Sequence, residues 1–252
     1  MDIDFELETQ HLFLIERVCR VCGKEKNLMS DFYKCRPDAT KISSYAFECK
    51  ECTRVRVREY ENKFISKCLE STTENIFNYS STETYVLDKG LSKIRHFIEE
   101  SIRTYVETVV IGGKYDEYDF DFRITQSWLN KTLRNSDGHH IHNHPNSFIS
   151  GVFYVRVKPD VDYIVFSRPN QQFFQFPIKE YNTFNSYQWS VGVSEGQLLL
   201  FPSTLIHEVK PPKVSNMISS DDDAYADRIS LSFNVFPTGR IGDSINLNEL
   251  RI

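Results

Sequence analysis

The sequence has no run of about 18 apolar residues, so nothing in it reads as a membrane-spanning helix. It also has no excess of basic residues: 30 Lys and Arg stand against 35 Asp and Glu, and the net charge of -5 argues against a general binder of polyanions. The opening segment MDIDFELETQ lacks the basic and apolar regions of a signal peptide. Internal repeats and low-complexity tracts are missing too. We therefore expect a globular protein of the cytoplasm.

Six cysteines are present, and four of them form two CxxC pairs, Cys19 with Cys22 and Cys49 with Cys52. Without a secretion signal, free thiols in a reducing cytosol are expected rather than disulfides. Two thiolate pairs at this spacing can complete a tetrahedral zinc site. Four protein ligands would close that site, so we predict a structural zinc. The alternative is four ordinary buried cysteines.

The cysteine-rich segment CRVCGKEKNLMSDFYKC…FECKECTR resembles small zinc-ribbon-like modules at the front of some phage proteins. A local basic cluster follows its second pair, where nucleic acid or another protein could make contact. Acidic residues balance these bases across the module, so a solvated helix face is the preferred interpretation. The cluster consists of Lys50, Arg54, Arg56 and Arg58.

Two regions of different character follow one another along the chain. We predict a zinc module with a following helix over 1–70, a polar linker over 71–84, and a larger domain over 85–252. Apolar residues at helical spacing predict helices over 53–68 and 91–109, and two glycines after the second supply a stop. Beyond Gly113 the apolar period changes to two, and short strands such as YDFDFRI, QQFFQFPI and RISLSFNVF follow. Many short strands without interleaved helices favour an antiparallel sandwich or barrel.

The segment DGHHIHNHPNSFISG contains four histidines: His139, His140, His142 and His144. Residues two apart on a strand share a face, so a pair of these imidazoles can hold one metal ion. A third ligand must come from a distant strand, and His207 at the end of LLLFPSTLIH is the candidate. Three ligands on one side of an ion leave positions open, as in non-haem iron oxygenases. A solvent-facing loop, an adventitious metal site and a zinc hydrolase pocket remain alternatives.

Downstream, the segment RISLSFN carries Arg228 and Ser230 on one face of an alternating strand. An arginine can hold a carboxylate through two parallel hydrogen bonds, so a buried Arg228 beside a metal pocket suggests an anionic co-substrate. The alternative is a structural salt bridge with the acidic segment just before it.

Together the pattern SWLN…HNHPNSFISGVFYV…EGQLLLFPSTLIHEV…RISLSFN resembles the iron(II)/2-oxoglutarate oxygenases of bacteria and phages, a family related to prolyl hydroxylases, over residues 85–240. The resemblance implies a double-stranded β-helix (jelly-roll) fold of mainly β structure with supporting helices. It implies a dioxygenase that oxidises an unidentified substrate with release of succinate and CO2, in the host cytoplasm if the chain is phage-encoded. The implied residues are iron ligands His142, His144 and His207, carboxylate-binding Arg228 and Ser230, and supporting Tyr154 and Asn234.

Two departures from the family pattern leave alternatives open. His144 stands where most such oxygenases have Asp, so a carboxylate from elsewhere, or His140, could be the ligand instead. The acidic segment 213–227 is longer than a hairpin requires, and we predict that it covers the pocket. Two other functions compete: a non-catalytic metal-binding jelly roll acting as an interaction module, and an HNH-like nuclease. A strand rather than a helix follows the histidines, which disfavours the nuclease.

Overall fold

The computed structural model describes residues 12, 14–35, 41–74, 78–134, 138–168, 177–182, 185–210, 227–242, 245–246 and 248–252. The chain divides into two compact units, Met1–Phe64 and Ile65–Ile252. Among the described residues, no helix combines the length and apolarity needed to cross a membrane.

The first unit contains two short hairpins, β1–β2 and β3–β4, and the start of a long helix. Its elements are β1 (Glu16–Val18), β2 (Glu25–Asn27), α2 (Leu28–Asp31), β3 (Phe32–Lys34), a 3-10 turn (Ile42–Ser44), β4 (Tyr45–Cys49) and α3 (Lys50–Glu70). Asn27 caps α2, because its side-chain oxygen accepts hydrogen bonds from the backbone of Met29 and Ser30. Buried residues from several of these elements form a small core: Leu12, Cys19, Leu28, Phe32, Tyr45 and Cys49.

The second unit is built on two antiparallel sheets. Its helical elements are α4 (Val86–Lys89), α5 (Ser92–Tyr105), a π-helical turn (Val106–Ile111) and a 3-10 turn (Tyr115–Glu117). Its strands are β5 (Thr72–Glu74), β6 (Tyr79–Ser81), β7 (Phe120–Thr132), β8 (His139–His142), β9 (Ile149–Arg156), β10 (Tyr163–Ser167), β11 (Gln188–Gly192), β12 (Leu198–Pro202), β13 (Ile206–Val209), β14 (Arg228–Ile241) and β15 (Leu250–Arg251). Gly112, at a φ of 62°, ends the π-helical turn as the two glycines predicted.

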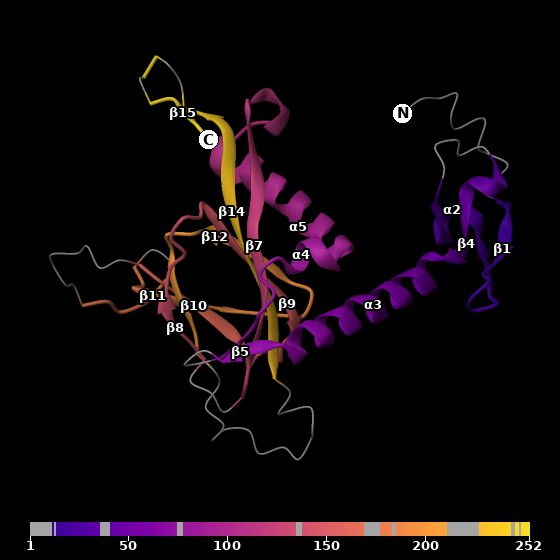
Figure 1. Ribbon diagram of the computed structural model, residues 1–252, viewed down its shortest axis with the longest axis horizontal. Coiled ribbons are helices and arrows are strands. Elements are labelled where there is room, and N and C mark those ends of the chain that lie inside the picture. Colours follow the sequence, from indigo (N-terminus) through magenta and orange to yellow (C-terminus); the bar gives the residue numbers. More distant parts are fainter. Residues whose placement is uncertain are drawn as a thin grey trace. The chain divides into compact units, whose positions relative to one another are not determined.

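The strand order identifies the architecture. The larger sheet runs β12-β9-β14-β7-β6-β5 and the smaller one β11-β10-β13-β8. From β7 to β14 the chain therefore passes back and forth between the sheets, and the two long strands β7 and β14 run side by side (Figure 1). This winding is the double-stranded β-helix, so the predicted mainly-β jelly roll with supporting helices is confirmed.

Apolar side chains from both sheets fill the space between them. The core residues are Tyr154, Val157, Ile164, Phe166, Val193 and Phe201. On the outer face of the larger sheet, Phe97 of α5 packs edge-on against Phe153 of β9, with ring centroids 6.2 Å apart. Helix α5 thus covers part of the outer face of this sheet.

Gly151 on β9 shows how tightly β9 and β14 pack. A methyl group added there would overlap the ring of Phe233, which is fully buried on β14. We expect Gly151→Ala to lower the free energy of unfolding by about 1–3 kcal/mol through overpacking. Chemical denaturation measures this, and Gly192→Ala on β11 is the matched control because open space surrounds that position. Equal stability of the two variants would contradict the packing described.

The segment 71–84, predicted to be a linker, contributes two strands to the edge of the larger sheet. Tyr79 and Ser80 pair with Lys131 and Asn130 of β7. The polar composition that indicated a linker has another cause: Asn78 and Ser81 are buried, and the Ser80 side chain donates a hydrogen bond to Asn130. Two other predicted features lie mostly outside the described residues. The strand predicted at 171–178 is described only at 177–178, and the acidic segment 213–227 only at Asp227.

Candidate active site

Three histidines converge at one end of the space between the sheets. The ligand atoms of His142, His144 and His207 all lie within 4.8 Å of one another. His142 ends β8 and pairs directly with His207 on β13. His144 follows two residues later, where its backbone N–H donates to the Ser203 carbonyl at 2.9 Å. The sheet register therefore brings together the two segments that the sequence identified.

Backbone carbonyls set the ring orientation of two of these histidines. The Nδ1 atom of His142 lies 2.7 Å from the His140 carbonyl, and that of His207 lies 2.9 Å from the Leu205 carbonyl. A carbonyl oxygen can only accept a hydrogen bond, so the Nδ1 atom of each ring must be the donor. Both rings therefore carry their hydrogen on Nδ1 and keep a lone pair on Nε2. The Nε2 atoms of His144 and His207 are 3.3 Å apart. Neighbouring ligands about 2.1 Å from an octahedral ion lie about 3 Å apart, so this spacing suits one metal ion.

All three rings stay neutral near pH 7. Burial lowers the pKa of His144 and of His207 to about 4, and it also lowers the pKa of His142. Protons therefore do not compete with a metal for these nitrogen lone pairs at physiological pH.

His144 is held in place although it lies beyond the end of β8. Its ring stacks on Trp128 of β7, with centroids 6.0 Å apart. A hydrogen bond with the Asn234 side chain partly offsets the lowering of the His144 pKa. Asn234 in turn accepts a hydrogen bond from Ser150 Oγ at 3.1 Å. These contacts orient the His144 ring although the residue lies outside any strand.

A cavity of about 350 Å³ extends from the three histidines between the sheets. This volume lies at the lower end of the range for small-molecule sites. Most polar wall residues come from the inner face of the larger sheet, where alternate residues of β7, β9 and β14 point inward. The residues that line it are Asn78, Ser80, Trp128, Asn130, Thr132, His139, His140, His142, His144, Ser150, Gly151, Val152, Ile164, Phe201, His207, Val209, Arg228, Ser230 and Ser232.

Arg228 provides the positive charge of the cavity. Only 4% of this residue is exposed, and one guanidinium nitrogen donates to the Tyr163 carbonyl at 3.1 Å. The guanidinium carbon lies 5.2 Å from the centre of the Tyr154 ring, close enough for a cation–π contact. Burial lowers the pKa of Arg228, yet an arginine stays charged at any physiological pH.

No carboxylate of the described residues forms an ion pair with Arg228. The nearest candidate, Asp162, is held by Arg134 through two hydrogen bonds of 2.5 and 2.9 Å, and it also accepts from the Lys158 backbone. A buried cation without its own anion is costly unless a ligand supplies one. The structural salt bridge considered for Arg228 is therefore not seen within the described part of the chain.

Ser230 lines the cavity two residues after Arg228, as the alternation predicted. Tyr154 does not line it: the ring is fully buried beneath Arg228, and its hydroxyl oxygen meets no hydrogen-bond partner among the described residues. Burial raises the pKa of Tyr154 to about 12, so the hydroxyl keeps its proton. Asn234 also stands outside the lining and contacts His144 instead. His140 is exposed and does not join the three converging ligand atoms.

Several cavity residues were not predicted from the sequence. Asn78 and Ser80 lie in the segment expected to be a linker, and no local pattern marks them. Trp128 and Asn130 could have been found, because they alternate on the strand SWLNKT that carries part of the family resemblance. His139 was noticed only as one member of the histidine cluster. Burial, followed by the charge of Arg228, lowers its pKa to about 3.

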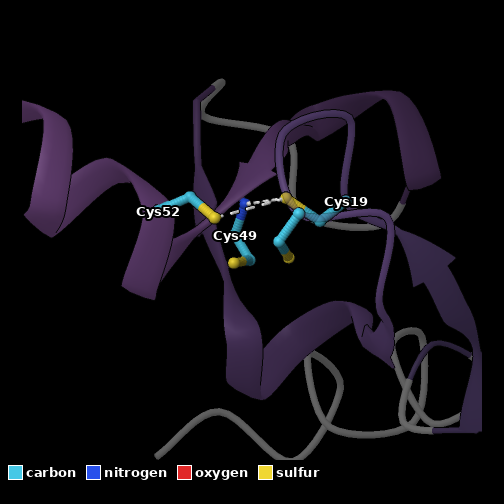
Figure 2. A group of neighbouring side chains, drawn as sticks. Cys19, Cys49 and Cys52 are labelled. Atoms are coloured by element: carbon cyan, nitrogen blue, oxygen red, sulfur yellow. Dashed lines mark hydrogen bonds between the residues drawn. The ribbon is translucent and has the colours of Figure 1, made fainter.

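The first unit brings the four CxxC cysteines together. The ligand atoms of Cys19, Cys22, Cys49 and Cys52 lie within 4.8 Å of one another, and all are free thiols. Cys19 and Cys52 are 3.9 Å apart at sulfur, and the backbone N–H of Cys49 points at Cys19 Sγ at 3.3 Å (Figure 2). A zinc tetrahedron with 2.3 Å bonds has edges of about 3.8 Å, far longer than a disulfide bond.

Backbone N–H groups favour the thiolate form of Cys19. Hydrogen bonds from Cys22 and then Cys49 lower the pKa of Cys19 to about 6. Burial and the neighbouring sulfurs raise the pKa of Cys52 to about 12. Four sulfurs this close cannot all be thiolates without a cation between them, and a metal ion supplies that charge.

Comparison with known families matches residues 126–234 to the family described as "Putative 2OG-Fe(II) oxygenase". The match includes the three converging histidines and Arg228. It covers less than half of the chain, and leaves out the cysteine cluster, Asn78 and Ser80. No protein of curated function matches the chain in sequence.

Several solved structures are similar to the chain at low identity. An oxidoreductase of the 2OG-Fe(II) oxygenase family from Burkholderia pseudomallei is 12% identical over 71% of this chain and 76% of its own, with a TM-score of 0.46. A Pseudomonas putida prolyl-4-hydroxylase is 13% identical over 74% and 86%, with a TM-score of 0.44. HygX from Streptomyces hygroscopicus, with nickel and 2-oxoglutarate bound, is 11% identical over 71% and 78%, with a TM-score of 0.44.

Proposed function

We propose that the chain is an iron(II)- and 2-oxoglutarate-dependent oxygenase. The observation that carries this proposal is one cavity with two dissimilar ends: three neutral imidazoles converge at one, and at the other Arg228 lies buried without a carboxylate partner among the described residues. A metal ion suits the first end and an organic anion the second. The family match over 126–234 supports the same assignment.

The donor set fits iron(II). Imidazole nitrogen is a ligand that iron accepts readily, and three ligands on one side of the ion leave open positions for small molecules. We assign His142, His144 and His207 as these ligands. Bound iron(II) would supply the oxygen chemistry. One oxygen atom of O2 would enter the succinate formed when 2-oxoglutarate loses CO2, and the other would be inserted into a substrate C–H bond.

We assign His144 as the ligand in place of a carboxylate, because no Asp or Glu of the described residues joins the group. Three neutral ligands leave the full charge of the metal ion uncompensated by protein. A doubly charged co-substrate would balance that charge when it binds. Trp128 and Asn234 support the assignment, since both orient the His144 ring.

The other end of the cavity fits the distal carboxylate of 2-oxoglutarate. Arg228 would hold this group through its guanidinium, and Ser230 would donate a hydroxyl hydrogen bond. Tyr154 supports Arg228 from below, because its buried ring lies against the guanidinium. Arg228 thus orients the co-substrate so that its keto acid end faces the histidines.

Succinate formation tests the proposed function. The purified protein should convert 2-oxoglutarate to succinate and CO2 only when iron(II) and oxygen are both present, and slow uncoupled turnover is expected even without the true substrate. Magnesium-dependent DNA cleavage without succinate would favour the nuclease instead. Neither activity, together with retained metal binding, would favour a non-catalytic interaction module.

We also propose that the four cysteines hold a structural zinc ion. The tetrahedral spacing and the backbone N–H groups directed at Cys19 support this assignment, and four protein ligands leave no open position for catalysis. Zinc would also stabilise a small unit whose apolar core is limited. The free thiols suit a reducing compartment, so we place the protein in the cytoplasm.

We expect Cys49→Ser to release the zinc and unfold the first unit, because binding free energy of a structural zinc is folding free energy. Metal analysis of the purified variant and limited proteolysis of residues 14–64 measure the two effects. Cys35→Ser is the matched control, since Cys35 is exposed and outside the cluster. Unchanged zinc content in Cys49→Ser would contradict the assignment.

A further inference from the structure

A chain of hydrogen-bonded amides and hydroxyls crosses the inner face of the larger sheet beside the cavity. Asn130 Oδ1 accepts from Ser80 Oγ at 3.0 Å and from Asn78 Nδ2 at 3.3 Å. Asn130 Nδ2 then donates to Ser232 Oγ at 2.9 Å. Three strands, β6, β7 and β14, are thereby joined through side chains as well as backbone. A satisfied network of this kind holds each member in one orientation.

Asn78 begins this chain and reaches further than the sheet. It is 94% buried, since only 6% of the residue is exposed, and it precedes β6 outside the family-matched segment. Besides its bond to Asn130, its Nδ2 atom also contacts His139 Nε2 within hydrogen-bond distance. Both amide hydrogens are therefore used. Because an amide NH2 only donates, His139 Nε2 must be the acceptor, and the ring proton must be on Nδ1.

His139 lies between the two ends of the cavity. Its ring centroid is 6.4 Å from that of His142 at the metal end, and the residue lies close enough to Arg228 to respond to its charge. With Nε2 engaged by Asn78, this histidine does not offer that nitrogen to a metal ion. It offers an Nδ1–H donor instead.

Ser232, like His139, accepts a hydrogen bond from the network and can donate one to the cavity. Its oxygen accepts from Asn130, so its hydroxyl hydrogen remains available to the cavity that it lines. Ser230 and Arg228 add an O–H group and N–H groups to the same wall. These groups can all donate and line the same cavity, which suits a ligand end that only accepts, such as a carboxylate.

We propose that Asn78 is a positioning residue that fixes His139 as an Nδ1–H donor to the carboxylate end of 2-oxoglutarate held by Arg228. The inference rests on the proposed function, because it assumes that this co-substrate occupies the cavity. It adds a binding group, His139, and a positioning residue, Asn78, which lies outside the family-matched segment.

Two measurements test this role. Nitrogen NMR of the imidazole rings in the metal-free protein should report the Nδ1–H tautomer for His139 in the wild type and a mixture of tautomers in Asn78→Ala. Titration of 2-oxoglutarate into nickel(II)-loaded protein, where no turnover occurs, should show about 10-fold weaker binding for both Asn78→Ala and His139→Ala. Nickel(II) affinity should remain within about threefold of the wild type, since neither residue is a proposed ligand.

Gln126→Ala, which removes an exposed amide from β7, is the matched control and should bind 2-oxoglutarate normally. An Nε2–H tautomer for His139 in the wild type would overturn the inference and requires no variant to fold. Wild-type affinity for 2-oxoglutarate in both cavity variants would also overturn it, while leaving the proposed function intact. No binding of 2-oxoglutarate by the nickel(II)-loaded wild type would overturn both.

Discussion

Replacing His207 with alanine is expected to lower iron(II) affinity by more than about 100-fold, above the 10- to 100-fold loss typical of groups that only support a ligand. His207 is 4% exposed, its Nδ1 is held by the Leu205 carbonyl, and its Nε2 faces the other two rings. Removing it leaves two imidazoles, which cannot enclose one side of an ion. Anaerobic equilibrium titration with iron(II) measures the loss.

Two comparisons make this experiment decisive. His96→Ala removes an exposed imidazole from α5 and should bind iron(II) as the wild type does. His144→Ala should show a loss similar to that of His207→Ala, because no described carboxylate is placed to substitute for it. Iron(II) affinity within about threefold of the wild type in His207→Ala would contradict the assignment of this histidine as a ligand.

Replacing Arg228 with alanine is expected to weaken 2-oxoglutarate binding by about 1.5–3 kcal/mol, the range for a hydrogen bond to a charged group. This corresponds to an increase of about 10- to 150-fold in the dissociation constant. The loss arises because the distal carboxylate then has no guanidinium beside it to compensate its charge. Titration of 2-oxoglutarate into nickel(II)-loaded protein measures the effect without turnover.

The folded state should tolerate this substitution better than removal of most buried ions. Asp162 keeps its two bonds to Arg134, so no described carboxylate is left unpaired when Arg228 is lost. Arg228→Lys should fall between the wild type and Arg228→Ala, because a lysine keeps the charge but not the planar pair of N–H donors. Arg123→Ala, at an exposed position of β7, is the control. Unchanged 2-oxoglutarate affinity in Arg228→Ala would refute the carboxylate site.

The sequence predicted the parts of the site that lie on regular strands. Alternation in RISLSFN placed Arg228 and Ser230 on one face, and both line the cavity. The same reasoning extended a strand through His144, whereas β8 ends at His142. His144 reaches the group because its backbone bonds to Ser203, a residue far along the chain, and local periodicity carries no signal for such a contact.

Part of the polar wall of the cavity could not be predicted from the sequence, because it also depends on contacts between residues far apart in the chain. Asn78 contacts Asn130 across 52 positions of the chain, and the segment around it resembles a linker because the residues that it buries are polar. Tyr154 was expected to help to hold the co-substrate, and its ring lies under Arg228 in the core. Which face of a strand points inward can be predicted, but the depth at which each side chain ends depends on the opposite sheet.

The sequence also predicted only part of the zinc module. The two CxxC pairs predicted a common site, and their sulfurs do converge. What the spacing could not predict is the difference among them, since the pKa of Cys19 is lowered by backbone N–H groups supplied by the fold. The lowered pKa of Cys19 therefore follows from tertiary structure.

The most direct test of the account is a spectrum of the anaerobic ternary complex. Adding 2-oxoglutarate to the iron(II)-loaded protein should produce the visible charge-transfer absorption of a keto acid chelated to iron(II). The band should be absent in His207→Ala and should require more 2-oxoglutarate in Arg228→Ala. A wild-type protein that retains iron(II) in this cavity but shows no such band at saturating 2-oxoglutarate would contradict the assignment of the site.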